Sequence, residues 1–124
     1  MLREKFENVS ESTVKELVNI YRNYTPRIRP FDGIPELLNF ISSHCKLGII
    51  SDGILSVQKR KLDALRLTNL FDHLVFPDQW GRKYWKPHLR GFKDCSIALK
   101  IKTRSMVYIG DNPEKTLLEP VTPE

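Results

Sequence analysis

The fold is decided by a stretch near the middle of the chain, which reads Leu47-Gly48-Ile49-Ile50-Ser51-Asp52-Gly53. Its first four residues form a nearly continuous apolar run, as expected of a strand buried on both faces of a parallel sheet. The run then breaks off into a hydroxyl, a carboxylate and a glycine. In α/β sheets, ligands bind in the crevice outside the carboxyl ends of the strands. The stretch therefore predicts a buried strand over residues 47–50 and a binding loop after it.

The same layout recurs further along, in the stretch Met106-Val107-Tyr108-Ile109-Gly110-Asp111-Asn112-Pro113. A strand is predicted over residues 106–109, and Asp111 follows it where a metal or phosphate site would need a carboxylate. Lys86-Pro87 stands between the two stretches, at the junction of a loop and a helix. A hydroxyl, a lysine and a carboxylate at such junctions suit phosphoryl chemistry.

The rest of the chain alternates between strand and helix patterns. Apolar periodicity and turn signals predict a further strand over residues 73–76 and helices over residues 13–24, 35–43, 55–65 and 89–99. Thr13 and Glu16 have capping-box spacing at the start of the first helix, and Leu37, Leu38 and Ile41 are expected to face inward in the second. This alternation predicts an α/β fold with a parallel sheet flanked by helices.

Composition sets the limits of the function. The chain has 124 residues, enough for one domain at most, with 40% hydrophobic and 28% charged residues. It has no apolar run of the roughly 20 residues that span a bilayer, and its first residues are charged, so we expect no membrane contact and no signal peptide. Cys45 and Cys95 are isolated, which favours partly buried thiols in a reducing compartment and a cytoplasmic location. The net charge of +5 favours anionic ligands without indicating a nucleic-acid partner.

Four segments in order resemble the motifs of the haloacid dehalogenase-like hydrolases, especially the members with a small helical cap. Residues 47–53 resemble the second motif, Lys86-Pro87-His88 the third, and residues 108–115 the fourth, an acidic metal-binding loop. Residues 32–38 resemble the proline-bearing segment that returns from the cap to the core. The resemblance implies a partial Rossmann-like parallel sheet. Residues 1–30 would be a remnant of the helical cap, and residues 31–124 a partial α/β core.

Two features depart from the family pattern. The first motif of the family is a strand ending in Asp-x-Asp, which carries the nucleophile and the general acid/base, and this sequence contains no Asp-x-Asp. Thr116 stands where the fourth motif often has another acid. The resemblance therefore implies an internal fragment of a hydrolase domain. Without the first strand its sheet would have an unpaired gap, which a strand-swapped or heterologous partner could fill.

The resemblance assigns the phosphate site to four residues of the second and third motifs. Ser51 would donate a hydrogen bond to a phosphate oxygen, helped by backbone N–H groups at Asp52 and Gly53. Lys86 would neutralise the phosphate and the nucleophile as a point charge. The alternatives are that Ser51 only caps the strand end and that Lys86 is a solvated lysine of a basic loop.

The resemblance also implies a metal ligand in the fourth motif. Asp111 would bind Mg²⁺, which takes hard oxygen ligands and keeps several waters. Asn112 and Glu114 would orient those waters. The alternative for Asp111 is a turn former, because Gly-Asp-Asn-Pro also has good turn chemistry. With the nucleophile missing, we expect the chain alone to bind Mg²⁺ weakly.

The implied function is that of a Mg²⁺-dependent phosphohydrolase, which in the complete domain acts on a small phosphorylated metabolite through an aspartyl-phosphate. This chain alone is expected to be inactive because it lacks the nucleophile. The alternative is a non-catalytic remnant or regulatory module that binds phosphate without turnover. A third hypothesis is a basic piece that binds anions or nucleic acid. Separately, the aromatic and cationic residues 80–86 could stack a base or sugar and attract phosphate. The competing interpretation of that segment is an amphipathic loop, and residues 59–61 are expected to be an exposed basic helix face.

Overall fold

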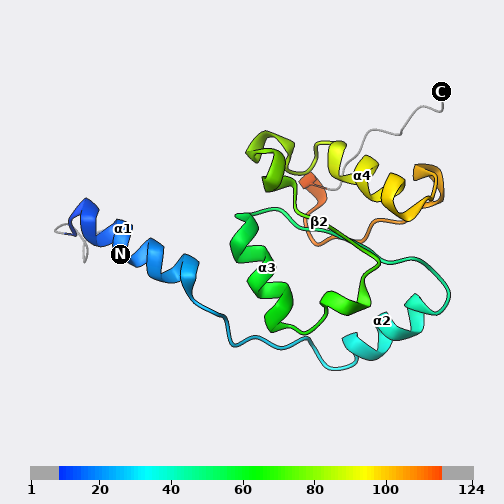
Figure 1. Ribbon diagram of the computed structural model, residues 1–124, viewed down its shortest axis with the longest axis horizontal. Coiled ribbons are helices and arrows are strands. Elements are labelled where there is room, and N and C mark those ends of the chain that lie inside the picture. The colour runs from blue at the N-terminus through cyan, green and yellow to red at the C-terminus, as the bar shows by residue number, and fades with distance from the viewer. Residues whose placement is uncertain (1–8, 116–124) are drawn as a thin grey trace.

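The structure is a computed structural model that describes residues 9–115. Its helices and strands are α1 (Glu11–Asn23), α2 (Ile34–Ser42), β1 (Gly48–Ile50), α3 (Leu55–Ala64), β2 (His73–Val75) and α4 (Arg90–Leu99). Short 3-10 turns lie at Thr68–Leu70, Pro77–Trp80, Arg82–Tyr84, Thr103–Ser105 and Pro113–Lys115. The predicted fold class is confirmed, because the two strands run parallel between flanking helices (Figure 1).

One face of the two-stranded sheet packs on α2 and α3. In the sheet, Gly48 pairs with His73 and Ile50 with Val75. Because side chains alternate along a strand, the residues between them, Ile49 and Leu74, point to the face that packs on α2 and α3. There they join an apolar cluster whose buried members are Leu62, Leu67 and Phe76. Leu38, from α2, also packs against this cluster. This face holds much of the core.

The other face of the sheet is covered by α4, which lies on the opposite side of the strands from α3 in Figure 1. Helix and sheet approach closely there: a Cβ atom at Gly48 would lie 2.4 Å from the Sγ atom of Cys95. Gly91 faces Ile50 and Val75 in the same way. Val75 is fully buried as a result. The chain therefore has the three layers of an α/β domain.

The third strand, predicted over residues 106–109, is not formed. This segment pairs with no strand in the described part of the chain, and Val107 and Ile109 are 89% and 87% exposed. A strand requires a hydrogen-bonded neighbour, and the sheet of residues 9–115 consists of β1 and β2. By the family resemblance, the neighbour of residues 106–109 would be the strand that ends in Asp-x-Asp. Apolar composition alone therefore overestimated the sheet.

Three local predictions differ from the structure: the start of the first helix, the burial of Leu37 and the partial burial of both cysteines. The first helix is capped by Ser10, whose hydroxyl accepts a 3.2 Å hydrogen bond from the Thr13 backbone N–H, so it begins before the predicted capping box. Leu37 is half exposed, against the prediction that it faces inward. Cys45 is exposed, whereas Cys95 is buried.

Helix α1 lies apart from the layers, at one end of the molecule (Figure 1). None of its residues is buried, so its apolar stripe faces outward along much of its length. Its carboxyl end is held by the guanidinium of Arg60, which donates to the backbone carbonyl of Arg22. The helices within residues 9–115 include none with the length and hydrophobicity of a membrane span.

Candidate active site

The candidate site begins where β1 ends. The pairing with β2 continues for one residue, since the Ser51 N–H donates to the Val75 carbonyl at 2.9 Å. The chain then turns at Gly53, whose φ of +117° is rarely adopted by residues with a side chain. Helix α3 starts two residues later. The turn thus places Ser51 and Asp52 between the end of a strand and the start of a helix, as predicted.

The hydroxyl of Ser51 has a partner in α3. Its Oγ donates a 3.0 Å hydrogen bond to the Oε1 of Gln58, and both side chains are partly buried. The Nε2 of Gln58 lies on Gly53, where a Cβ atom would come within 2.5 Å of it. The Gln58 amide therefore packs into the turn that carries Ser51.

The carboxylate of Asp52 is a structural anchor for two other segments. Its side chain is only 6% exposed, and its two oxygens accept hydrogen bonds of 3.1 and 3.2 Å from the backbone N–H of Lys86. The Nζ of Lys115 lies 3.8 Å from the same carboxylate. Asp52 therefore ties the third and fourth predicted motifs to the end of β1.

The ammonium of Lys86 lies beside the end of the same strand. It donates at 3.1 Å to the carbonyl of Ile50, the residue before Ser51, and at 2.9 Å to the hydroxyl of Tyr108. An ammonium has three N–H donors, so these contacts leave one for a further acceptor. Ser51 and Lys86 are thus brought to one rim of the sheet, from segments 35 residues apart in sequence.

The loop after residue 109 reaches this rim through Lys115 and leaves Asp111 exposed. The side chain of Asn112 accepts a 3.0 Å hydrogen bond from the Glu114 N–H, an Asx-type turn that starts the last 3-10 turn. Asp111 and Glu114 both lie on the exposed side of this loop. The loop is therefore near the Ser51–Lys86 rim, while its carboxylates face solvent.

The described residues do not by themselves make a magnesium site. Among residues 9–115, no three His, Cys, Asp or Glu side chains are grouped as a metal ion would require. The best-placed carboxylate, that of Asp52, already accepts from Lys86 and faces Lys115. Mg²⁺ needs near-octahedral oxygen coordination, and Asp111 alone is a poor basis for it.

In the aromatic and cationic segment, residues 80–86, the rings make cation–π contacts with arginine side chains of the segment and of α4. The Arg90 guanidinium lies 4.4 Å from the ring centre of Trp80 and 4.6 Å from that of Tyr84, and Arg82 lies 5.1 Å from that of Trp85. These contacts occupy ring faces that a stacked base would need. The geometry favours the amphipathic loop over the base-stacking hypothesis.

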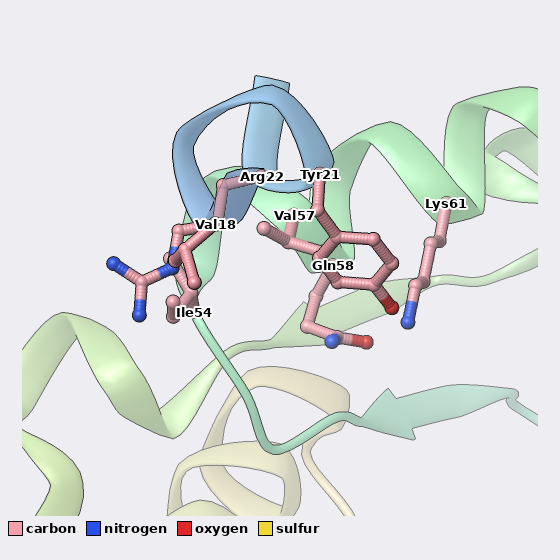
Figure 2. A pocket seen from close by; sticks show the side chains of 7 residues that line it. All are labelled: Val18, Tyr21, Arg22, Ile54, Val57, Gln58 and Lys61. Carbon is pink, nitrogen blue, oxygen red and sulfur yellow. The ribbon is translucent and has the colours of Figure 1, made fainter. Parts of the chain in front are cut away.

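The structure adds a hollow that the sequence did not indicate, between α1 and α3 (Figure 2). Its volume is about 330 Å³, and we call it the α1–α3 hollow. It is lined by Val18, Tyr21, Arg22, Ile54, Val57, Gln58 and Lys61. The basic residues predicted as an exposed face are thus divided: Lys59 is exposed, whereas Arg60 and Lys61 are half-buried beside α1.

Three residues of this region were missed in the sequence: Gln58, Tyr108 and Lys115. Gln58 lies seven residues after Ser51, on the first turn and a half of a helix that starts at the binding loop, and that spacing is a usable signal. Tyr108 was assigned to a strand, and Lys115 was only part of a quoted motif. Their contacts depend on how the loop closes back, which no local pattern encodes.

Comparison with known proteins defines the class to which this arrangement belongs. The sequence profile of the family described as haloacid dehalogenase-like hydrolase matches residues 1–116. The chain therefore belongs to the haloacid dehalogenase-like hydrolases, and the predicted family is confirmed.

Curated relatives include two kinds of phosphate-ester hydrolase. A glyceraldehyde 3-phosphate phosphatase of Methanocaldococcus jannaschii is 32% identical over 91 residues, which cover 73% of this chain and 39% of the relative. The pyrimidine 5'-nucleotidase YjjG of Escherichia coli is 32% identical over 90 residues, covering 72% and 39%. The chain thus spans about two fifths of the length of these relatives. No solved structure matches it significantly.

Proposed function

We propose that this chain supplies the phosphate-binding part of a Mg²⁺-dependent phosphohydrolase that acts on a small phosphorylated metabolite. The observation that carries the proposal is the 3.1 Å contact of the Lys86 ammonium with the Ile50 carbonyl, directly before Ser51. It brings a cation and a hydroxyl to one strand end, with one ammonium donor left over. The named activities of the relatives, on glyceraldehyde 3-phosphate and pyrimidine 5'-nucleotides, support a small substrate.

The proposed roles follow from the chemistry of phosphoryl transfer. The transition state spreads negative charge over the equatorial oxygens, so catalysis rests on positioning and charge stabilisation. Ser51 would donate to one phosphate oxygen, and backbone N–H groups at Asp52 and Gly53 to others. Lys86 would supply the positive charge. Asp52 would keep Lys86 in place, since it binds the backbone N–H of that residue.

Magnesium and the nucleophile belong to the proposal only for the complete domain. There the nucleophilic carboxylate would attack the phosphorus and displace the alcohol of the ester, and water would then hydrolyse the aspartyl-phosphate to free phosphate. A bound Mg²⁺ would supply positive charge for this chemistry. Asp111 would be one metal ligand, with Asn112 and Glu114 orienting its waters. The exposed position of Asp111 leaves it accessible to a cation.

Binding of inorganic phosphate tests the site without requiring turnover. We expect Lys86→Ala to weaken phosphate binding about tenfold or more, and Ser51→Ala by a smaller factor, as measured by isothermal titration calorimetry. Each removes a hydrogen bond to a charged group, but the Ser51 hydroxyl must first give up its bond to Gln58. Lys83→Ala is the matched control, since Lys83 lies in the same loop and its ammonium faces the ring of Tyr84. Equal affinity in all four proteins would refute the phosphate site.

Hydrolysis of p-nitrophenyl phosphate separates the enzyme from the second candidate, a phosphate-binding module without turnover. The absence of Asp-x-Asp from the sequence favours the second candidate for this chain alone. We expect no turnover by the chain and Mg²⁺-dependent turnover when a strand ending in Asp-x-Asp is fused before Met1. A fused protein that binds phosphate without hydrolysing the ester would support the module.

The gap in the sheet could be filled by a strand from a partner. A second copy of the chain could pair with the open edge, but only another protein could bring the Asp-x-Asp carboxylates, which this sequence does not contain. The exposure of Val107 and Ile109 supports such a partner, because apolar side chains on an unpaired segment favour strand addition. A concentration-dependent dimer in light scattering would support strand exchange between copies. We propose a cytoplasmic location and no nucleic-acid partner, on the isolated cysteines and the modest net charge.

A further inference from the structure

Gln58 joins two places that the proposed function treats separately. Its Oε1 accepts the hydrogen bond of Ser51 Oγ at 3.0 Å, and its side chain also lines the α1–α3 hollow. In the view of Figure 2, the Gln58 amide lies just below the ring of Tyr21. One amide group therefore contacts both the predicted phosphate-binding hydroxyl and the neighbouring cavity.

The contact with Ser51 opposes phosphate binding. A serine hydroxyl has a single proton to donate, and in the structure that proton goes to Gln58. A phosphate dianion offers only acceptors, so Ser51 can donate to it only by breaking its hydrogen bond to the Oε1 of Gln58. The Oε1 of Gln58 would then lose its partner in a partly buried position, and this lowers the net gain from the phosphate contact.

The α1–α3 hollow can supply the missing partner. Its volume of about 330 Å³ is at the lower end of the range of about 300–1,000 Å³ for small-molecule sites. Val18, Ile54 and Val57 give it an apolar lining, and the side chains of Arg22 and Lys61 lie on opposite sides of the group in Figure 2. A small organic group with a hydroxyl can lie there, donate to Gln58 and free Ser51.

We propose that Gln58 is a positioning residue that makes phosphate binding depend on the organic part of the substrate. When that part fills the α1–α3 hollow and bonds to the amide, Ser51 is released to donate to the phosphate. The substrate class is a phosphate monoester whose small organic part carries a hydrogen-bonding hydroxyl. This inference rests on the proposed phosphate site at Ser51 and adds the means by which esters are preferred over inorganic phosphate.

The test compares the affinities of three probes by isothermal titration calorimetry: inorganic phosphate, glycerol 3-phosphate and uridine 5'-monophosphate. Gln58→Met removes the group that accepts from Ser51, and we expect it to raise the affinity for inorganic phosphate about three- to tenfold, the worth of one hydrogen bond. The variant should also prefer an ester over inorganic phosphate less strongly than the wild type does. Gln79→Met is the matched control, because Gln79 is exposed and distant in sequence. Of the two esters, the one that the wild type binds more tightly indicates whether the substrate is triose-like or nucleotide-like.

Two further arms keep the inference separate from the proposed function. If Ser51→Ala leaves the affinity for the preferred ester unchanged, the phosphate site itself is wrong. If Ser51→Ala weakens binding of the ester but Gln58→Met leaves the affinity for inorganic phosphate unchanged, only the role of Gln58 is wrong. In the wild type, the side-chain amide NMR signal of Gln58 should move on addition of the preferred ester. A signal that stays fixed while the ester binds would overturn the inference even if the Met variant did not fold.

Discussion

Residues 73–76 and 106–109 are both short, mainly apolar segments, yet only the first forms a strand. Val75 is fully buried and Phe76 is 5% exposed, whereas Val107 and Ile109 are almost completely exposed. The difference lies in the neighbours: residues 73–75 pair with β1, and residues 106–109 pair with no strand of the described chain. A strand is therefore decided by a partner as much as by its own side chains.

The largest effect is expected at the centre of the packed segment. Val75→Asp would put a carboxylate into a site without solvent, at a cost on the order of 3–5 kcal/mol or more. Domains of this size are stable by only about 5–15 kcal/mol. We expect the variant to lose its cooperative thermal transition, as followed by circular dichroism.

The matched substitution in the other segment should be tolerated. Val107→Asp places the same carboxylate on a side chain that is 89% exposed, so stability should change by about 0.5 kcal/mol or less. If both variants unfolded equally, residues 106–109 would be buried in solution. The contrast between the two segments would then be wrong.

The contrast also explains what the sequence could reveal about the fold. The strands at residues 48–50 and 73–75 were predictable because each is apolar, short and bounded by breakers, and because they pair with each other. Residues 106–109 satisfy the same local criteria, but their pairing is a tertiary property. Likewise, the apolar periodicity of α1 predicts a helix with an apolar face, but it does not report whether another element covers that face.

The candidate site was predictable to a similar extent. Ser51 was expected at the carboxyl end of its strand and Lys86 at the junction of a loop and a helix, and the family resemblance assigned both to one phosphate site. The structure brings them to one rim. Their chemical roles stay predictions. The anchoring of Asp52 by Lys86 and Lys115 could not be predicted, because a backbone N–H and a distant ammonium carry no pattern in the sequence.

A second, smaller effect is expected on α4, the helix that contacts both segments. Phe92, which is 7% exposed on α4, meets the ring of Tyr108 edge to face at 5.1 Å between centroids. Phe92→Ala should cost about 3–5 kcal/mol through lost burial and the cavity left behind. Urea denaturation would measure it, with Phe31→Ala as the control because Phe31 is 87% exposed. A loss no greater than that of the control would show that the packing of Phe92 contributes little to the stability of the fold.

A third effect isolates the polar contact that holds residues 106–109. Tyr108→Phe keeps the ring on Phe92 but removes the hydroxyl that accepts from Lys86 at 2.9 Å. We expect a loss of about 1 kcal/mol in urea denaturation and faster hydrogen exchange in the segment. Tyr24→Phe is the control, since Tyr24, which follows the last residue of α1, is 58% exposed. An unchanged exchange rate would mean that this contact does not hold the segment.

The smallest effect concerns the polar contact that holds β2 in register. The Asp72 carboxylate accepts hydrogen bonds from the Leu47 N–H at 2.8 Å and from the Lys46 ammonium at 3.3 Å, and these bonds, that of Leu47 foremost, lower its pKa below the ordinary 3.8. A lowered pKa in the folded state stabilises the protein above pH 3.8, and this stabilisation is lost as the pH falls through the folded pKa. Asp72→Asn should therefore melt slightly below the wild type at pH 7, and the difference should shrink as the pH falls below 3.8. A difference that persisted unchanged at low pH would show that the charge of Asp72 does not matter to the pairing of β2.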